Sequence, residues 1–375
     1  MTLRIKLLVL LTALAVLGGV AAASLLHASD RAAEKDRAQA GGPPVASGRI
    51  TLTPDATRRI VFRNMAWGPH RDELATVPAD APGGPRTASG VKCLRFHAAA
   101  GTGICLQAER GTVEDAYRAV VLDAGLKERA HYALPGIPTR ARVSPSGRFV
   151  AWTVFVGGDS YAGTDFSTRT AVLDTGTNRL TASLEEFTVI KDGTEHRAAD
   201  TNFWGVTFSR DDRHFYATMA TGGKTYLVRG DLGARTVTTL HQNVECPSLS
   251  PDETRVVYKK RVAGAPADAP WRLYALDLST FRETPLADRR SVDDQAVWLD
   301  ARTVAYSLPG DFGADLYAVP ADGSGAPKRL LTAGLAPVVL GGAGEREGPL
   351  SQGRENGLTG GGCLRRGSWR RPGPP

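Results

Sequence analysis

Short segments in which apolar and polar residues alternate recur between residues 49 and 340. The clearest example is Ser248–Arg261, where one alternating segment enters a polar turn at Ser250–Glu253 and a second, rich in Val and Tyr, leaves it. Proline presets φ for the first central position of a turn, and aspartate accepts hydrogen bonds from the backbone that follows it. The pattern therefore predicts two antiparallel strands joined by a tight turn.

The same pattern is written more than once in the chain. Thr51–Arg58 matches Ser248–Arg255 at Leu, Pro, Asp, Thr and Arg. Separately, Glu73–Asp80 recurs as Asp315–Asp322, with five of the eight residues identical. Two internal matches so far apart are difficult to explain by chance, and they indicate a repeated structural unit.

Six such units follow one another at a spacing of about 40–50 residues, which is the period of propeller blades. One insertion interrupts them around Glu185–Phe203, and no stretch outside the N-terminus keeps a helical period. The units open at Thr51–Arg58, Cys93–His97, Val143–Arg148, Val206–Asp212, Ser248–Arg255 and Val297–Asp300. These observations predict an all-β fold, a six-bladed β-propeller over residues 49–340.

A propeller closes only when the two ends of the chain meet in one blade, because closure leaves only short sheet edges exposed. Ala336–Leu340 is the last apolar segment that could form a strand. We therefore expect it to complete the blade that residues 49–88 begin. A chain ending at Leu331 should then be less stable than one ending at Leu340.

The N-terminus carries an export signal. Arg4 and Lys6 precede an almost unbroken apolar run, Leu7–Leu26, which is typical of a signal sequence. Ala21–Ala23 supplies a cleavage site, but a run of about 20 apolar residues can also span a bilayer. We interpret residues 1–29 as a signal peptide or, the favoured reading, an uncleaved signal anchor. Residues 30–48 are predicted to be a linker, and the remainder of the chain then faces an extracytoplasmic space.

Charge and composition narrow the function classes further. The chain has 375 residues and a formal net charge of +7, and part of the excess lies at its two ends. The tail, residues 341–375, holds six Arg against three Glu and is dominated by Gly and Pro, so we expect it to be disordered. Its composition would also fit a frameshift product. The propeller itself carries too little positive charge to indicate nucleic-acid binding.

The turns and strands resemble the WD40-like repeat of TolB-type propellers. The Ser-Pro-Asp turn, the apolar strand after it and the aspartate that ends a later strand carry the resemblance. Asn202–Phe208, Val244–Pro251 and Ser291–Gln295 further resemble exported TolB-like proteins of high-GC Gram-positive bacteria, which are generally named for their fold. The resemblance implies a protein that docks partners on propeller faces. TolB's separate N-terminal α/β domain has no counterpart here, so TolB's partners are not carried over.

The sequence leads us to assign no catalytic, cofactor-binding or metal-ligating residue. The seven histidines form no i,i+3 or i,i+4 pair, and no cysteine lies at metal-ligand spacing from another. Gly158–Gly163 is one residue too long for a serine-hydrolase elbow. A centre gathered at the propeller axis stays open, because local spacing would not reveal it. We interpret the basic run Lys259–Arg261 as solvated, with anionic surface binding as the alternative.

Two further sets of residues, four aspartates and two cysteines, each have two possible interpretations. Four aspartates end repeat strands, and we interpret them as turn formers, with calcium binding as the alternative; they are Asp174, Asp231, Asp277 and Asp322. Cys93 and Cys105 flank a predicted hairpin centred on Ala99. In an oxidising compartment we expect them to form a disulfide, the alternative being two buried thiols.

The leading hypothesis is a non-enzymatic extracytoplasmic scaffold that docks a protein or peptide on a propeller face or in the axial channel. It would act as a monomer, without a cofactor and without nucleic acid, at the membrane if the N-terminal helix is retained. The alternative is an exported propeller enzyme, a hydrolase or lyase, whose active site lies in the channel.

Overall fold

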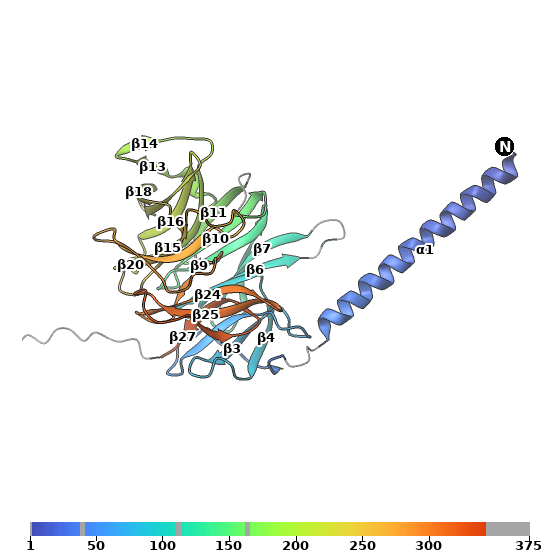
Figure 1. The fold of residues 1–375 in the computed structure, drawn as a ribbon, viewed down its shortest axis with the longest axis horizontal. Helices are drawn as coiled ribbons and strands as arrows, with labels where there is room; N and C mark the ends of the chain where they lie inside the picture. Colours follow the sequence, from blue (N-terminus) through green and yellow to red (C-terminus); the bar gives the residue numbers. More distant parts are fainter. Residues whose placement is uncertain (1, 38–41, 110, 112–114, 162–165, 343–375) are drawn as a thin grey trace, which may run out of the picture. The chain divides into compact units, whose positions relative to one another are not determined.

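We describe the protein from a computed structural model, in which residues 2–37, 42–109, 111, 115–161 and 166–342 are described (Figure 1). The predicted tail therefore lies outside the described residues from position 343 onward. Its Cys363 lies there too.

The N-terminal segment forms one helix, α1 (Leu3–Asp36), which continues beyond the predicted end at residue 29. Within it, Arg4–Asp30 has a mean hydropathy of 2.3 and is long and apolar enough to cross a membrane. The same length and composition are found in signal sequences. The helix therefore fits either the signal peptide or the anchor predicted from the sequence.

Residues 45–340 form six sheets, each built on four antiparallel strands from the centre outward. The first blade consists of β27 (Gly334–Leu340), β2 (Arg59–Asn64), β3 (Glu73–Pro78) and β4 (Arg86–Lys92). The second consists of β5 (Arg95–Ala99), β6 (Thr102–Glu109), β7 (Ala116–Leu122) and β8 (Glu128–Leu134). The third consists of β9 (Ile137–Val143), β10 (Phe149–Gly157), β11 (Ser167–Asp174) and β12 (Arg179–Thr181).

The fourth blade consists of β15 (Asn202–Phe208), β16 (His214–Thr221), β17 (Lys224–Asp231) and β18 (Thr236–Gln242). The fifth consists of β19 (Glu245–Leu249), β20 (Arg255–Arg261), β21 (Trp271–Asp277) and β22 (Glu283–Pro285). The sixth consists of β23 (Val297–Trp298), β24 (Thr303–Gly310), β25 (Gly313–Pro320) and β26 (Lys328–Leu331). Each innermost strand contacts the innermost strands of both neighbouring blades, so six strands surround one axis: β27, β5, β9, β15, β19 and β23. The all-β, six-bladed propeller predicted from the repeats is confirmed.

Two sheets carry extra strands that the repeat pattern did not predict. β1 (Val45–Ser47) pairs in parallel with β4, inside the range expected to be a linker. In the fourth blade, β13 (Thr188–Lys191) and β14 (Thr194–His196) extend the outer edge, preceded by a short 3₁₀ helix, η1 (Leu184–Glu186). They come from the insertion recognised around Glu185–Phe203.

The ring closes by pairing the last strand of the chain with its first long one. β27 runs antiparallel to β2, with Leu340 opposite Arg59 and Val338 opposite Val61. In Figure 1 the orange-red β27 therefore lies in the same blade as the blue β3 and β4. Thr51–Arg58 keeps its turn, in which Asp55 accepts the amide of Thr57, but the strand before that turn is replaced by β27.

The strand-turn-strand interpretation of Ser248–Arg261 is confirmed as β19, a turn and β20. The Glu253 amide donates to the Ser250 carbonyl, and the Asp252 carboxylate accepts the Thr254 amide. Glu253 has φ of 59°, and Gly147 has φ of 80° at the equivalent turn of the third blade. Apolar side chains of neighbouring blades pack on each other, as Ile104 and Leu106 do with Val150 and Trp152. Burying both faces of each sheet stabilises the ring.

Candidate binding site in the axial channel

Charged side chains gather along the axis because three innermost strands and one connecting segment each contribute them. β5 carries Arg95, β9 carries Arg140 and Arg142, and β19 begins at Glu245. The segment before β23 adds its acidic and amide side chains at positions 293–295. Burial lowers the pKa of Arg95 and of Arg142 to about 10. Both stay cationic at neutral pH.

Gln295 closes the middle of the channel. Its amide nitrogen donates to the carbonyls of Gly205 (3.1 Å), Val206 (3.2 Å) and Pro247 (2.7 Å). The neighbouring Asp294 is buried, and its carboxylate accepts the amides of Gln295 and Ser307. A hollow of about 30 Å³ lies beside Gln295, and Arg140, Arg142 and His97 all line it. Gln295, which we call the plug, lies between two chemically different groups of side chains.

On one side of the plug lies a cation–aromatic cluster, which we define as Arg140, Lys259, Arg261, Glu245, Asp293, Tyr161, Trp204 and Trp271. Lys259 is fully buried, with its ammonium 2.5 Å from the Asp293 carboxylate and 4.0 Å from the Trp271 ring centre. The expectation that the basic run Lys259–Arg261 is solvated is therefore wrong for Lys259. The residue faces inward from β20, where a carboxylate and an aromatic face replace water.

The cations of this cluster are matched from within the protein. Glu245 accepts a hydrogen bond from Arg261 Nε (2.8 Å), and its other oxygen lies 3.8 Å from Lys259 Nζ. Arg140 lies 3.6 Å from Asp293 and 5.0 Å from the centre of the Tyr161 ring. Burial raises the pKa of Tyr161, whose hydroxyl also bonds Thr139. Cation–π contacts of this kind gain strength when water is excluded.

Tyr161 comes from the loop whose glycines suggested a hydrolase elbow. Its ring packs against Phe155, Phe166 and Trp204, with centroids 4.7, 5.5 and 5.2 Å away. The described part of that loop thus contributes an aromatic side chain to a buried cluster. Ala162 and Gly163 lie outside the described residues.

On the other side of the plug, the channel widens into a cavity of about 300 Å³, which we call the mouth cavity. The Ser-Pro turns that follow β9 and β19 form part of its rim, with Arg210 and Glu253. Its walls include Thr207, Phe208, Ser248, Leu249, Val297, Trp298, Val338 and Val339. Arg142 and His97 line both this cavity and the small hollow beside Gln295, so they form its floor. Pockets of this size and mixed lining are typical of binding sites.

The floor differs from the cluster because its cation, Arg142, forms no ion pair with a carboxylate of the described residues. Arg142 Nη1 lies 3.1 Å from His97 Nε2, and Nη2 lies 3.5 Å from the Ala296 carbonyl. Among the described residues, no carboxylate forms an ion pair with Arg142, and its Nε has no hydrogen-bond partner. Burial, followed by the charge of Arg142, holds the pKa of His97 well below its usual range. His97 is therefore neutral at pH 7.

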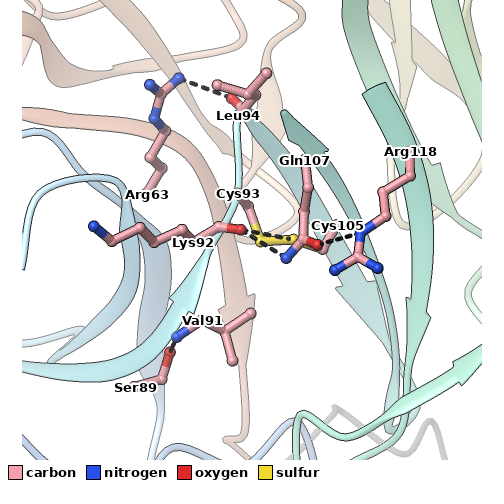
Figure 2. The surroundings of a disulfide bond; sticks show 9 residues. All are labelled: Arg63, Ser89, Val91, Lys92, Cys93, Leu94, Cys105, Gln107 and Arg118. Carbon is pink, nitrogen blue, oxygen red and sulfur yellow. Dashed lines mark hydrogen bonds between the residues drawn. A yellow bond between two sulfur atoms is a disulfide. The ribbon is translucent and has the colours of Figure 1, made fainter. Parts of the chain in front are cut away.

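The cysteines singled out in the sequence lie at the junction of the first two blades (Figure 2). Cys93 follows β4, Cys105 lies inside β6, and the structure joins them in a disulfide with Cα atoms 5.3 Å apart. The carbonyl of Leu94, next to Cys93, accepts a hydrogen bond from Arg63 Nη1 (3.0 Å). The disulfide thus ties the closing blade to its neighbour. Cys246 is a buried free thiol.

The strand-ending aspartates form turns, as predicted. Asp174 accepts the amide of Gly176, Asp231 those of Gly233 and Ala234, Asp277 those of Ser279 and Thr280, and Asp322 that of Ser324. Hydrogen bonds from the turn lower the pKa of Asp277 and Asp322. Within the described residues, no group of three or more His, Cys, Asp or Glu could hold a metal ion.

No protein-family model matches the chain, and no curated protein sequence matches it. Among solved structures it is similar to TolB from Acinetobacter baumannii, with a TM-score of 0.48 and 17% identity over 76% of this chain and 67% of that one. It is also similar to a puromycin-hydrolyzing peptidase from Mycobacterium tuberculosis (TM-score 0.44, 14% identity, 75% of this chain and 46% of that one).

A third similar structure is an oligogalacturonate lyase from Vibrio parahaemolyticus (TM-score 0.42, 9% identity, 66% of this chain and 72% of that one). Of the Mycobacterium tuberculosis peptidase, this chain covers less than half of the length. TolB structures are among the neighbours of this propeller, as the repeat pattern led us to expect. The narrower resemblance to exported proteins of high-GC Gram-positive bacteria stays a prediction. These likenesses concern the fold, and the function has to be argued from the channel.

Proposed function

We propose that the protein is a non-enzymatic extracytoplasmic binding scaffold, which receives a segment of a partner protein or peptide in the mouth cavity. The observation that carries the proposal is the cavity itself. It opens at the rim formed by Arg210 and Glu253, has apolar walls such as Phe208 and Leu249, and ends on two polar side chains. Apolar walls with a few placed polar groups favour binding of a chain segment. The apolar helix α1 supports an extracytoplasmic position.

The opposite end of the channel fits the alternative, a channel-centred enzyme, poorly. Its ionisable groups could do acid–base chemistry only if a substrate reached them. However, the side chains of Lys259 and Glu245 are 0% and 1% exposed. Their charges are held by each other and by Asp293. Buried, mutually paired ions of this kind are typical of structural networks.

A site-specific photocrosslink tests the proposal. A crosslinking amino acid at Arg210, on the cavity rim, is compared with one at Arg179, which is exposed on the outermost strand β12 of the third blade. In cells producing the full chain, we expect position 210 to capture one envelope protein or peptide, and position 179 to capture none of it. Equal capture at both positions, or none at 210, would refute docking in the mouth cavity.

A further inference from the structure

Arg142 is a buried cation that forms no ion pair with a carboxylate among the described residues. The residue is 7% exposed, and its Nε has no hydrogen-bond partner among the described residues. The carboxylate near enough to influence it, Asp294, already accepts two backbone amides. A buried charge costs free energy unless it is paired and hydrogen-bonded. A ligand that supplied the missing anion would remove that cost.

His97 adds a second unsatisfied donor at the same place. Its Nδ1 faces the backbone amide of Val143 at 3.1 Å, and its Nε2 faces Arg142 Nη1 at 3.1 Å. Both neighbours are donors, whereas a neutral imidazole offers one acceptor and one donor. Whichever tautomer forms, one N–H points at another N–H. With Nδ1 accepting from Val143, the Nε2–H is left beside Arg142 without an acceptor.

We propose that the floor of the mouth cavity is a carboxylate-binding site, in which Arg142 and His97 Nε2–H donate to the same carboxylate. The proposal rests on the proposed function for the source of that group, which is the C-terminus or an acidic side chain of the docked segment. A carboxylate oxygen between the two side chains would accept from both and neutralise Arg142. Guanidinium–carboxylate hydrogen bonds are among the strong, charge-assisted kind.

The rest of the cavity favours a carboxylate on an apolar chain over a phosphate. Phe208, Leu249 and Val297 form apolar walls above the floor. Among the described residues that line the mouth cavity, Arg142 is the cation away from the rim. The rim bears the carboxylate of Glu253, which accepts the backbone amide of Arg210. A dianion such as phosphate would bring two negative charges into a cavity that already bears the Glu253 carboxylate, with the single buried cation Arg142 to compensate them. A singly charged group fits the count of charges.

The test uses the full chain in detergent and two probes of equal shape, hexanoate and hexanamide, in calorimetric titrations. We expect hexanoate to bind saturably and about tenfold or more tightly than hexanamide, because a hydrogen bond to a charged group is lost in the amide. Arg142→Gln should weaken hexanoate by about tenfold or more. The matched control Arg179→Gln removes the same charge from the exposed strand β12, outside the mouth cavity, and should change the affinity by less than about threefold. Inorganic phosphate should bind less tightly than hexanoate.

A second variant and a second readout guard against misfolding. His97→Gln should weaken hexanoate as well, and in the wild-type protein hexanoate should shift the ¹⁵N resonance of His97 Nε2. Equal affinities for hexanoate and hexanamide, or full hexanoate affinity in folded Arg142→Gln, would overturn the site. Short peptides with a free or amidated C-terminus, and with Asp or Asn, then show which carboxylate is used. Hexanoate binding without a crosslink at position 210 would refute the docking proposal alone.

Discussion

The two ends of the axial channel use buried cations in opposite ways. In the cation–aromatic cluster, Lys259 and Arg140 face Asp293 and aromatic rings, and Glu245 bridges Lys259 and Arg261. At the floor of the mouth cavity, Arg142 faces a neutral imidazole and a carbonyl. Lys259, Glu245 and Arg142 are all buried, whereas the side chains of Arg261 and Asp293 are 39% and 45% exposed. The difference between the buried cations of the two ends therefore lies in the paired carboxylates.

This difference distinguishes charged side chains that stabilise the fold from a charged side chain that is available to bind a ligand. An ion network that is complete within the protein holds neighbouring blades together, and needs nothing from outside. A buried cation without an anion is destabilising by itself, and such strain is found where a ligand completes the arrangement. Removing a charge should therefore destabilise the protein at one end of the channel and stabilise it at the other.

The largest effect is expected for Glu245→Gln in the cluster. The change leaves Arg140, Lys259 and Arg261 with Asp293 as the remaining carboxylate of the cluster, in a site where Glu245 has no exposed surface. Breaking a buried pair by removing one partner costs about 3–5 kcal/mol, so we expect the free energy of unfolding in urea to fall by that amount.

The control for this change is Glu186→Gln, which breaks an ion pair with Arg235 (2.7 Å) whose side chains are 51% and 35% exposed. Exposed pairs contribute about 0–1 kcal/mol, so the control should change little. Hexanoate binding should persist in Glu245→Gln, because Glu245 lines neither the mouth cavity nor the hollow beside Gln295. A loss of binding equal to that of Arg142→Gln would mean that the two ends are one site.

A smaller effect is expected from the disulfide, which lies beside the start of β5. The double substitution of Cys93 and Cys105 by Ser should lower the free energy of unfolding by about 3 kcal/mol, which is the value expected for a short cross-linked loop. The two positions are 12 residues apart in the sequence. Reduction of the wild-type protein should produce the same change, and the serine variant should not respond to reductant. If reductant destabilises both proteins equally, the disulfide is absent from the exported protein.

The sequence predicted the fold because its signals are local. The turn Ser250–Asp252 and its counterparts Thr53–Asp55 and Ser144–Ser146 are each written in consecutive residues, and apolar alternation marks the neighbouring strands. The closing strand could be predicted for the same reason, since Ala336–Leu340 is the last apolar segment available. β1 was missed because three residues in parallel pairing carry no recognisable period.

The channel could not be predicted, because its side chains come from different blades. His97, Arg142 and Gln295 are far apart in the sequence and meet only when the ring closes. One signal was present: Arg140 and Arg142 alternate with small residues on one strand, so both point to the same face. An innermost strand with two arginines on its inner face indicates a charged axis. The sequence does not show that Arg140 lies 3.6 Å from Asp293, whereas Arg142 forms no ion pair among the described residues.

The smallest effect distinguishes the two ends most directly. Arg142→Met removes the unpaired cation and keeps an unbranched apolar side chain, and we expect it to raise the free energy of unfolding by about 1 kcal/mol. The same substitution two residues earlier, Arg140→Met, is the matched control. Arg140 Nε and Nη2 also have no hydrogen-bond partner, but Nη2 lies 3.6 Å from the Asp293 carboxylate and the guanidinium lies 5.0 Å from the centre of the Tyr161 ring.

Arg140→Met should therefore lower the free energy of unfolding by about 1–2 kcal/mol, because Asp293 then loses a positively charged neighbour and the Tyr161 ring loses a cation–π contact. Urea unfolding of the two variants in the same buffer measures the difference in sign. Saturating hexanoate should stabilise the wild-type protein and Arg140→Met, but leave Arg142→Met unchanged. If both substitutions destabilise the protein by similar amounts, Arg142 is satisfied within the fold, and its place at the cavity floor no longer indicates a ligand.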